Sequence, residues 1–151
     1  MVPRDPGTRR VPFEDPSAAA LRAFRGHLEL EEIDAARGVF DKTRGRIVGW
    51  RPPPTEWLEL IGGLIRAAAW DDAVRILQAY VDEIEDPAPR VRLKLAQLLL
   101  QRQSRPARAL KILAGVPVES LPPPLRRIHA ELTRKAGQAL EEGPLELGDE
   151  V

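Results

Sequence analysis

Apolar residues recur along most of the chain at intervals of three and four positions, which is the spacing of one face of an α-helix. This pattern predicts three pairs of helices, over about residues 18–29 and 31–42, 56–68 and 73–84, and 91–102 and 106–114. A last helix is predicted over about 125–140, with Ile128 on its inward face. Ala68 stands at the end of the first helix of the second pair, where we expect it to face inward.

The connections between these helices are marked by proline, glycine and short polar residues. Residues 43–55 contain two glycines and three prolines, so we expect an irregular connection there, with Thr55 as the N-cap of the next helix. Tight turns are predicted at residues 70–72 and 104–106, the second because proline is tolerated in a first helical turn.

The apolar positions repeat when the sequence is shifted by 36 residues. Three aligned sets come from the first helix of each pair: Leu21, Trp57 and Leu93; Phe24, Leu60 and Ala96; and Leu28, Leu64 and Leu100. In the second helices Ala73 and Leu77 align with Ala109 and Leu113, and Ala36 and Phe40 follow after a slip of one residue. One helix pair cannot bury both of its apolar faces, so the repeat predicts pairs stacked around a shared core.

These residues resemble the tetratricopeptide repeat pattern, which the middle unit matches with Trp57, Leu60, Leu64, Ala73 and Leu77. The period is 36 rather than the 34 of that family, and Ile61 and Gln97 replace its usual small residues. The resemblance implies an all-α fold, a right-handed stack of antiparallel helix pairs with a capping helix. The expected organisation is a flexible arm over 1–15, units over about 16–50, 51–87 and 88–118, a capping helix over 122–142, and an acidic disordered tail over 143–151.

The resemblance also implies a partner-binding groove, lined by first-helix residues that do not pack inward. Mapping by the repeat places eight residues in it: Arg22, Leu58, Ile65, Arg66, Lys94, Leu98, Gln101 and Arg102. This mixture suits a peptide or helix with acidic and apolar side chains. The chain contains no Asn, which the carboxylate clamps of chaperone-binding members use.

The run from residue 90 to 121 also resembles soluble repeat segments that follow rhomboid-type membrane proteases in some bacteria. No stretch here reaches 18 uninterrupted apolar residues, so the sequence predicts no membrane insertion. The N-terminus lacks the apolar stretch of a secretory signal, which leaves the cytoplasm as the expected compartment. Arg outnumbers Lys 19 to 4, which is typical of a GC-rich bacterial genome.

Amino-acid composition limits the classes of function that the chain can have. Hydrophobic residues make up 43% of the chain, and the abundance of Leu and Ala among them favours helices. The net charge is zero, which argues against binding to nucleic acid as a general property, and the absence of Cys excludes disulfides and thiolate metal sites. His27 and His129 have no spaced partner for zinc or for a nucleophile, so we expect no catalytic residue, no cofactor and no metal.

Charge is nevertheless unevenly distributed. No acidic residue occurs from position 87 to 118, where seven are basic: Arg90, Arg92, Lys94, Arg102, Arg105, Arg108 and Lys111. This segment is either an ordinary solvated surface or a site for an anionic partner. One hypothesis is that the acidic residues of the tail visit it.

Three functions fit these observations. The first is a non-catalytic adaptor or scaffold that binds another protein in the groove. The second is a structural module that forms homodimers. The third is a helical repeat that binds nucleic acid through its basic third unit, although no aromatic residues are interleaved with the basic ones for base stacking.

Overall fold

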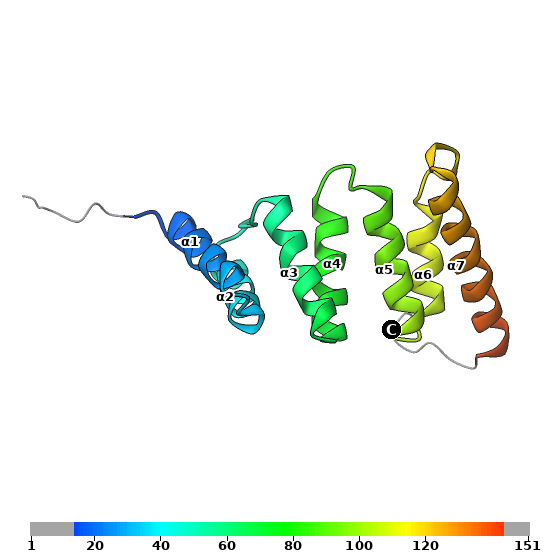
Figure 1. Cartoon of the computed structure of the whole chain (residues 1–151), viewed down its shortest axis with the longest axis horizontal. Helices are drawn as coiled ribbons and strands as arrows, with labels where there is room; N and C mark the ends of the chain where they lie inside the picture. The colour runs from blue at the N-terminus through cyan, green and yellow to red at the C-terminus, as the bar shows by residue number, and fades with distance from the viewer. Residues whose placement is uncertain (1–13, 144–151) are drawn as a thin grey trace, which may run out of the picture. The chain divides into compact units, whose positions relative to one another are not determined.

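The structure, a computed structural model, describes residues 14–143 and is all-α (Figure 1). Over this range it contains no strand, as predicted, and it has seven α-helices: α1 (Pro16–Glu29), α2 (Ile33–Arg46), α3 (Pro54–Arg66), α4 (Trp70–Glu83), α5 (Pro89–Gln101), α6 (Pro106–Ala114) and α7 (Pro123–Glu142). A short 3-10 helix, Val118–Ser120, precedes α7. The predicted arm over 1–15 and tail over 143–151 lie outside the described residues, except for Glu14, Asp15 and Gly143.

The chain divides into two compact units, residues 1–63 (unit 1) and 64–151 (unit 2). The boundary falls inside α3, whereas the sequence places unit boundaries in the connections. The reason is that the first part of α3 packs with the preceding helices: the Trp57 ring lies 5.6 Å from the ring of Phe40 in α2.

Prolines start most of the helices. Five of the seven helices between residues 14 and 143 begin at a proline: Pro16, Pro54, Pro89, Pro106 and Pro123. A first-turn residue needs no N–H for the helix ladder, and the ring already holds φ near its helical value, so proline favours a helix at this position. Thr55 therefore lies in the first turn of α3 and is not its N-cap, which corrects the prediction.

The turns inside the first two hairpins share one backbone motif. Glu31 after α1 and Ala68 after α3 have left-handed backbone, with φ of 58° and 57°. At the first turn Glu32 N–H donates to the His27 carbonyl at 2.8 Å, and at the second Ala69 N–H donates to Leu64 at 2.9 Å. These six-residue closures define Schellman motifs, in which the left-handed position is usually glycine. Ser104 after α5 is also left-handed, with φ of 53°.

These turns explain the slip in the sequence repeat. The left-handed residues Glu31 and Ala68 are 37 positions apart, while Ala68 and Ser104 are 36 apart. Helix α1 therefore turns one residue earlier than α3 does, and every following position in its hairpin is displaced by one. The one-residue slip of Ala36 and Phe40 from the 36-residue repeat arises at this turn. These two residues still occupy core positions equivalent to those of Ala73 and Leu77.

Three predicted boundaries are wrong. Residues 70–72 were expected to form a turn, but α4 begins at Trp70, and the turn lies at the three alanines before it. Ala68 is consequently exposed and does not line a helix face. At the end of the first pair, α2 continues to Arg46 through the start of the predicted connection, and Thr43 is buried.

The core of unit 1 is an aromatic cluster of Phe24, Phe40, Trp50 and Trp57. The Phe24–Trp50 and Phe40–Trp50 ring pairs are edge-to-face, with centroids 6.3 Å apart. Trp50 therefore packs the long connection onto the first hairpin. Arg44 lies over the Phe40 and Trp57 rings at 5.2 and 5.4 Å and donates to the Trp50 carbonyl at 3.0 Å, which covers the edge of the cluster.

In unit 2, helices α5, α6 and α7 pack side by side, and α4 packs against α5 (Figure 1). Arg92 near the start of α5 donates to the Gly115 carbonyl just after α6 at 2.9 Å, and His129 early in α7 contacts the Leu113 carbonyl at 3.0 Å. The end of α6 thus lies beside the starts of both neighbours, so α5 and α7 run parallel to each other and antiparallel to α6.

The repeated positions predicted to be inward are mostly buried. Ala36, Ala73 and Ala109 are fully buried at equivalent places in the second helices, and Phe24, Leu60 and Ala96 are fully buried in the first. Ile128 is an exception, because it lies on the flank of the apolar face of α7 and is 46% exposed. Between residues 14 and 143 no helix is both long and apolar enough to cross a bilayer.

Candidate functional site

The basic segment of unit 2 separates into structural and exposed residues. Arg92 and Arg108 are half-buried and bonded within the unit, Arg92 to the Gly115 carbonyl at 2.9 Å and Arg108 to the Gln78 side chain at 3.2 Å. Arg90, Lys94 and Arg102 on or next to α5 are exposed, as is Lys111 on α6. Only this exposed set is open to a partner.

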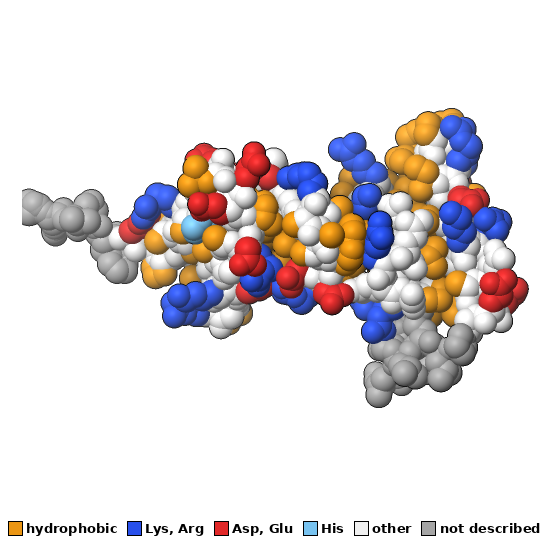
Figure 2. All heavy atoms as spheres, turned by 60° about the horizontal axis from the view of Figure 1, so that its bottom comes forward, with side chains coloured by type: hydrophobic (Ala, Val, Ile, Leu, Met, Phe, Trp, Pro, Cys, Tyr) orange, Lys and Arg blue, Asp and Glu red, His pale blue; other side chains and the backbone are white. Residues whose placement is uncertain are grey.

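Four polar residues form a line along α5. Arg90, Lys94, Gln97 and Gln101 follow one another at intervals of four, three and four residues, so they share one face of the helix over about 16 Å. Arg102 follows directly at the C-terminal end. We call these five residues the α5 stripe; Figure 2 shows the blue side chains on this part of the surface.

Trp70 holds the last member of the stripe in place. The Arg102 guanidinium lies 4.4 Å from the centroid of the Trp70 ring, at the start of α4. Next to it, the Gln103 amide donates to the Asp71 carboxylate at 2.8 Å. Stacking on a ring face leaves the N–H groups at the edge of the guanidinium directed outward, in the geometry that binds a carboxylate through two parallel hydrogen bonds.

The cations of the stripe lack the carboxylate partners that other arginines have. Arg25 pairs with Glu56 at 2.9 Å, Arg75 with Asp72 at 2.9 Å, and Arg134 with Glu131 at 2.8 Å. No carboxylate in the described part of the chain forms an ion pair with Arg90, Lys94 or Arg102; Lys94 donates only to the Gln97 amide oxygen, at 3.1 Å. Unit 2 therefore presents positive charge that its own described residues leave unmatched.

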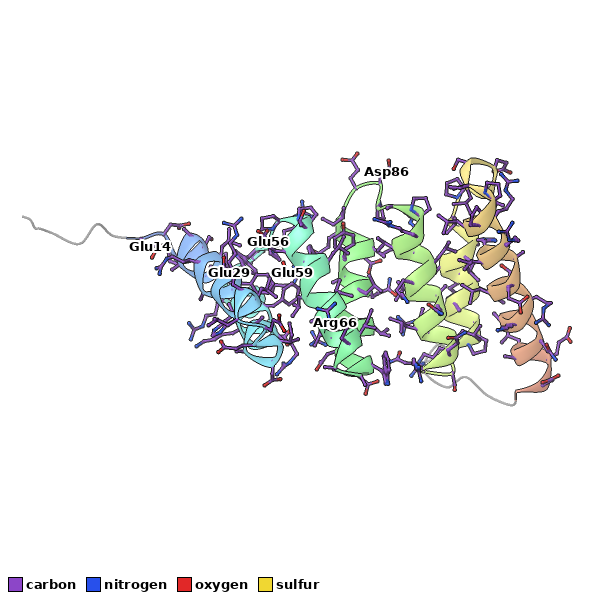
Figure 3. The ribbon with its side chains drawn as sticks, viewed as in Figure 1. Glu14, Glu29, Glu56, Glu59, Arg66 and Asp86 are labelled. Carbon is purple, nitrogen blue, oxygen red and sulfur yellow. The ribbon has the colours of Figure 1, made fainter. Side chains whose placement is uncertain are left out.

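The charge of unit 2 is segregated by helix. The segment from α4 to the start of α5 is acidic, with Asp71, Asp72, Asp82, Glu83, Glu85 and Asp86, while α5 and α6 contain no acidic residue. Figure 3 labels Asp86 in the loop before α5, and Arg66 at the end of α3. Arg66 is exposed and corresponds to Arg102 in the repeat, so it adds a cation at the equivalent end of another helix.

The eight predicted groove residues differ in their exposure to solvent. In unit 2, Arg66, Lys94, Gln101 and Arg102 are exposed and Ile65 is half-buried, whereas Leu98 is 4% exposed. The expectation that Leu98 is open to a partner is therefore wrong, because its side chain is buried among the packed helices of unit 2. In unit 1, Leu58 is half-buried and Arg22 is exposed.

Arg22 differs from the stripe residues because it already has a partner. Its guanidinium pairs with the Glu14 carboxylate, and the hydrogen bonds from Arg22 lower the pKa of Glu14 below its usual value. Sequence reasoning did not anticipate this pair, since Glu14 lies in the segment expected to be an arm. Unit 1 also bears Glu29, Glu56 and Glu59, labelled in Figure 3, of which Glu56 accepts from Arg25.

The histidines and serines have local roles. His27 contacts the Glu32 carboxylate at 2.8 Å across the α1–α2 turn, and Ser120 donates to the Pro117 carbonyl at 2.9 Å. None of the described serines, Ser17, Ser104 and Ser120, caps a helix through its side chain. In residues 14–143 no three His, Asp or Glu side chains are grouped so that they could hold a metal ion.

The outer face of α7 is polar. Leu132 and Ala136 are buried on its inner face, while Arg127, Glu131, Arg134 and Lys135 are exposed. Glu131 pairs with Arg134 at 2.8 Å and with Lys135 at 3.7 Å, and the hydrogen bonds from Arg134 lower the pKa of Glu131.

Comparison with models of protein families, with curated proteins and with solved structures found no match.

Proposed function

We propose that this protein is a non-catalytic interaction scaffold, which binds an acidic peptide or helix of another protein on the α5 stripe. The observation that carries the proposal is the set of exposed cations, Arg90, Lys94 and Arg102, that have no carboxylate partner among the described residues. Arg25, Arg75 and Arg134 are paired with carboxylates of the chain itself, whereas these three cations leave a carboxylate-binding surface open to a partner.

The spacing of the stripe supports a peptide partner. Arg90 and Lys94 are one helical turn apart, about 6 Å along the axis. Carboxylates four residues apart on a helix, or two apart in an extended strand, have nearly the same separation. Gln97 and Gln101 add neutral donors and acceptors, and the stacked Arg102 gives one point of bidentate recognition.

The resemblance to tetratricopeptide repeats supports the same proposal, because members of that family bind peptides along their first helices. The exposed residues Lys94, Gln101 and Arg102 are ones that this resemblance assigns to the groove. We include Arg66 and Ile65 as neighbouring contacts, and we leave Leu98 out because it is buried.

The test is affinity capture with the purified full chain, followed by identification of bound proteins. The variant K94E/R102E reverses two charges of the stripe. K42E/R127E is its matched control, since Lys42 and Arg127 are exposed residues on α2 and α7 and undergo the same charge change. Both variants are checked for helicity by circular dichroism.

We expect a specific acidic protein to be retained by the wild type and by K42E/R127E, and to be lost with K94E/R102E. The interaction should weaken as salt is raised, because exposed charges are screened. Retention by both variants would contradict the proposal. Salt-sensitive retention of nucleic acid instead of protein would favour a nucleic-acid-binding function. A dimer detected by light scattering would favour a structural module that forms homodimers.

A further inference from the structure

The residues that follow α7 have the opposite charge to the α5 stripe. Glu146, Asp149 and Glu150 are the only charged side chains in 144–151, and Leu147 and Gly148 separate Glu146 from the adjacent pair Asp149 and Glu150. This segment lies outside the described residues, and its place of attachment is fixed by the end of α7 at Glu142.

The attachment point lies at the same end of unit 2 as Arg102. Helix α7 runs parallel to α5, because the start of each lies beside the end of α6: Arg92 bonds Gly115, and His129 contacts Leu113. The two helices also pack against each other. The chain therefore leaves α7 at the end of unit 2 where α5 ends in Gln101 and Arg102.

The segment is long enough to reach the cations at the C-terminal end of the stripe. Residues 144–151 span up to about 26–29 Å when extended. The distance along α5 from Arg102 back to Arg90 is about 18 Å, at 1.5 Å for each of the intervening residues. Carboxylates two residues or more apart in an extended segment can thus reach more than one cation of the stripe.

We propose that residues 144–151 bind the α5 stripe of the same chain and compete with the acidic partner, an inference that rests on the function proposed above. Tethering gives the segment a local concentration of the order of millimolar, so weak pairing is enough to occupy the stripe for part of the time. An external partner then binds with lower apparent affinity than the bare stripe would give it.

The experiment compares full-length chains. E146Q/D149N/E150Q removes the three carboxylates of the segment. E85Q/D86N/E119Q is the matched control, because it removes three exposed carboxylates elsewhere in unit 2 and raises the net charge equally. The probe is a labelled synthetic peptide of alternating Glu and Leu residues, and its dissociation constant is measured by fluorescence anisotropy with each chain and with K94E/R102E.

We expect E146Q/D149N/E150Q to bind the probe several-fold more tightly than the control does, and K94E/R102E to abolish binding. Equal affinity of the tail variant and its control would overturn the competition while leaving the scaffold function standing. Probe binding that K94E/R102E does not weaken, or no binding by any chain, would instead overturn the scaffold function itself. If the difference in probe affinity between E146Q/D149N/E150Q and its control disappears when the protein is diluted, residues 144–151 bind the stripe of a neighbouring copy. That result would overturn the intramolecular contact.

Discussion

Ile33 occupies the space that a side chain at Gly63 would need. A Cβ atom added at Gly63 would lie 2.4 Å from Ile33 Cδ1 and 2.8 Å from Ile33 Cγ1. Ile33 is the first residue of α2, and Gly63 is buried within α3, so glycine allows the start of one helix to approach the next closely. The Gly62-Gly63 pair in the sequence therefore contains a packing position.

Gly63→Ala should destabilise unit 1 by about 1 kcal/mol. Alanine gains about 1 kcal/mol of helix propensity over glycine, but overpacking against Ile33 costs about 1–3 kcal/mol. The control is Gly38→Ala in α2, where an added Cβ meets no atom within 4 Å and the same propensity gain should raise stability. The measurement is the urea midpoint of unfolding, and equal shifts for the two variants would show that the Ile33 contact has no cost.

A double-mutant cycle separates the contact from propensity. In an Ile33→Ala background the atoms that clash with residue 63 are absent, so Gly63→Ala should become neutral or stabilising. If the effect of Gly63→Ala is the same in both backgrounds, the close approach is not the reason for glycine at this position.

Ala68→Gly should stabilise the protein by about 1 kcal/mol, although it removes a methyl group. Ala68 has a left-handed backbone, with φ of 57°, which costs a residue with a Cβ about 1–2 kcal/mol and glycine almost nothing. Ala130→Gly in the exposed middle of α7 is the control, and it should lose about 1 kcal/mol. Urea unfolding that shows the same sign for both substitutions would contradict this account of the turn.

Ala73→Leu and Ala109→Leu should each destabilise unit 2 by about 1–3 kcal/mol. Both alanines are fully buried at equivalent positions of α4 and α6, where a longer side chain has no room without displacing a neighbouring helix. Ala130→Leu, at an exposed position of α7, should change stability by less than about 0.5 kcal/mol. Tolerance of leucine at both buried sites, measured by thermal unfolding, would mean that these alanines are not packing positions of a repeat.

The sequence predicted the helices well, because their existence depends on a periodic signal carried by many residues. Trp57, Leu60 and Leu64 all lie on the buried face of α3, so an error about any one of them would leave the predicted helix unchanged. Helix ends depend on one or two residues and were predicted less well. Ala68 adopts the left-handed conformation without glycine or asparagine to signal it, so the turn was placed at Asp71 and Asp72, which instead suit the positive N-terminal end of α4.

The candidate site was predictable in part. The exposure of Lys94 and Arg102 follows from their positions in the helix pattern. The burial of Leu98 and the pairing of Arg22 with Glu14 depend on contacts with another helix and with a residue outside the periodic segments. The stacking of Arg102 on Trp70 joins residues far apart in the sequence, and no local pattern indicates it.

The most direct test of the account is a titration of the isotopically labelled full chain with the Glu-Leu peptide, followed by amide NMR. The account predicts chemical-shift changes concentrated at Arg90, Lys94, Gln97, Gln101 and Arg102, with little change along the outer face of α7 at Arg127 and Arg134. Changes concentrated on α7 or in unit 1, or no change at a concentration of peptide that binds, would contradict the claim that the α5 stripe is the binding surface.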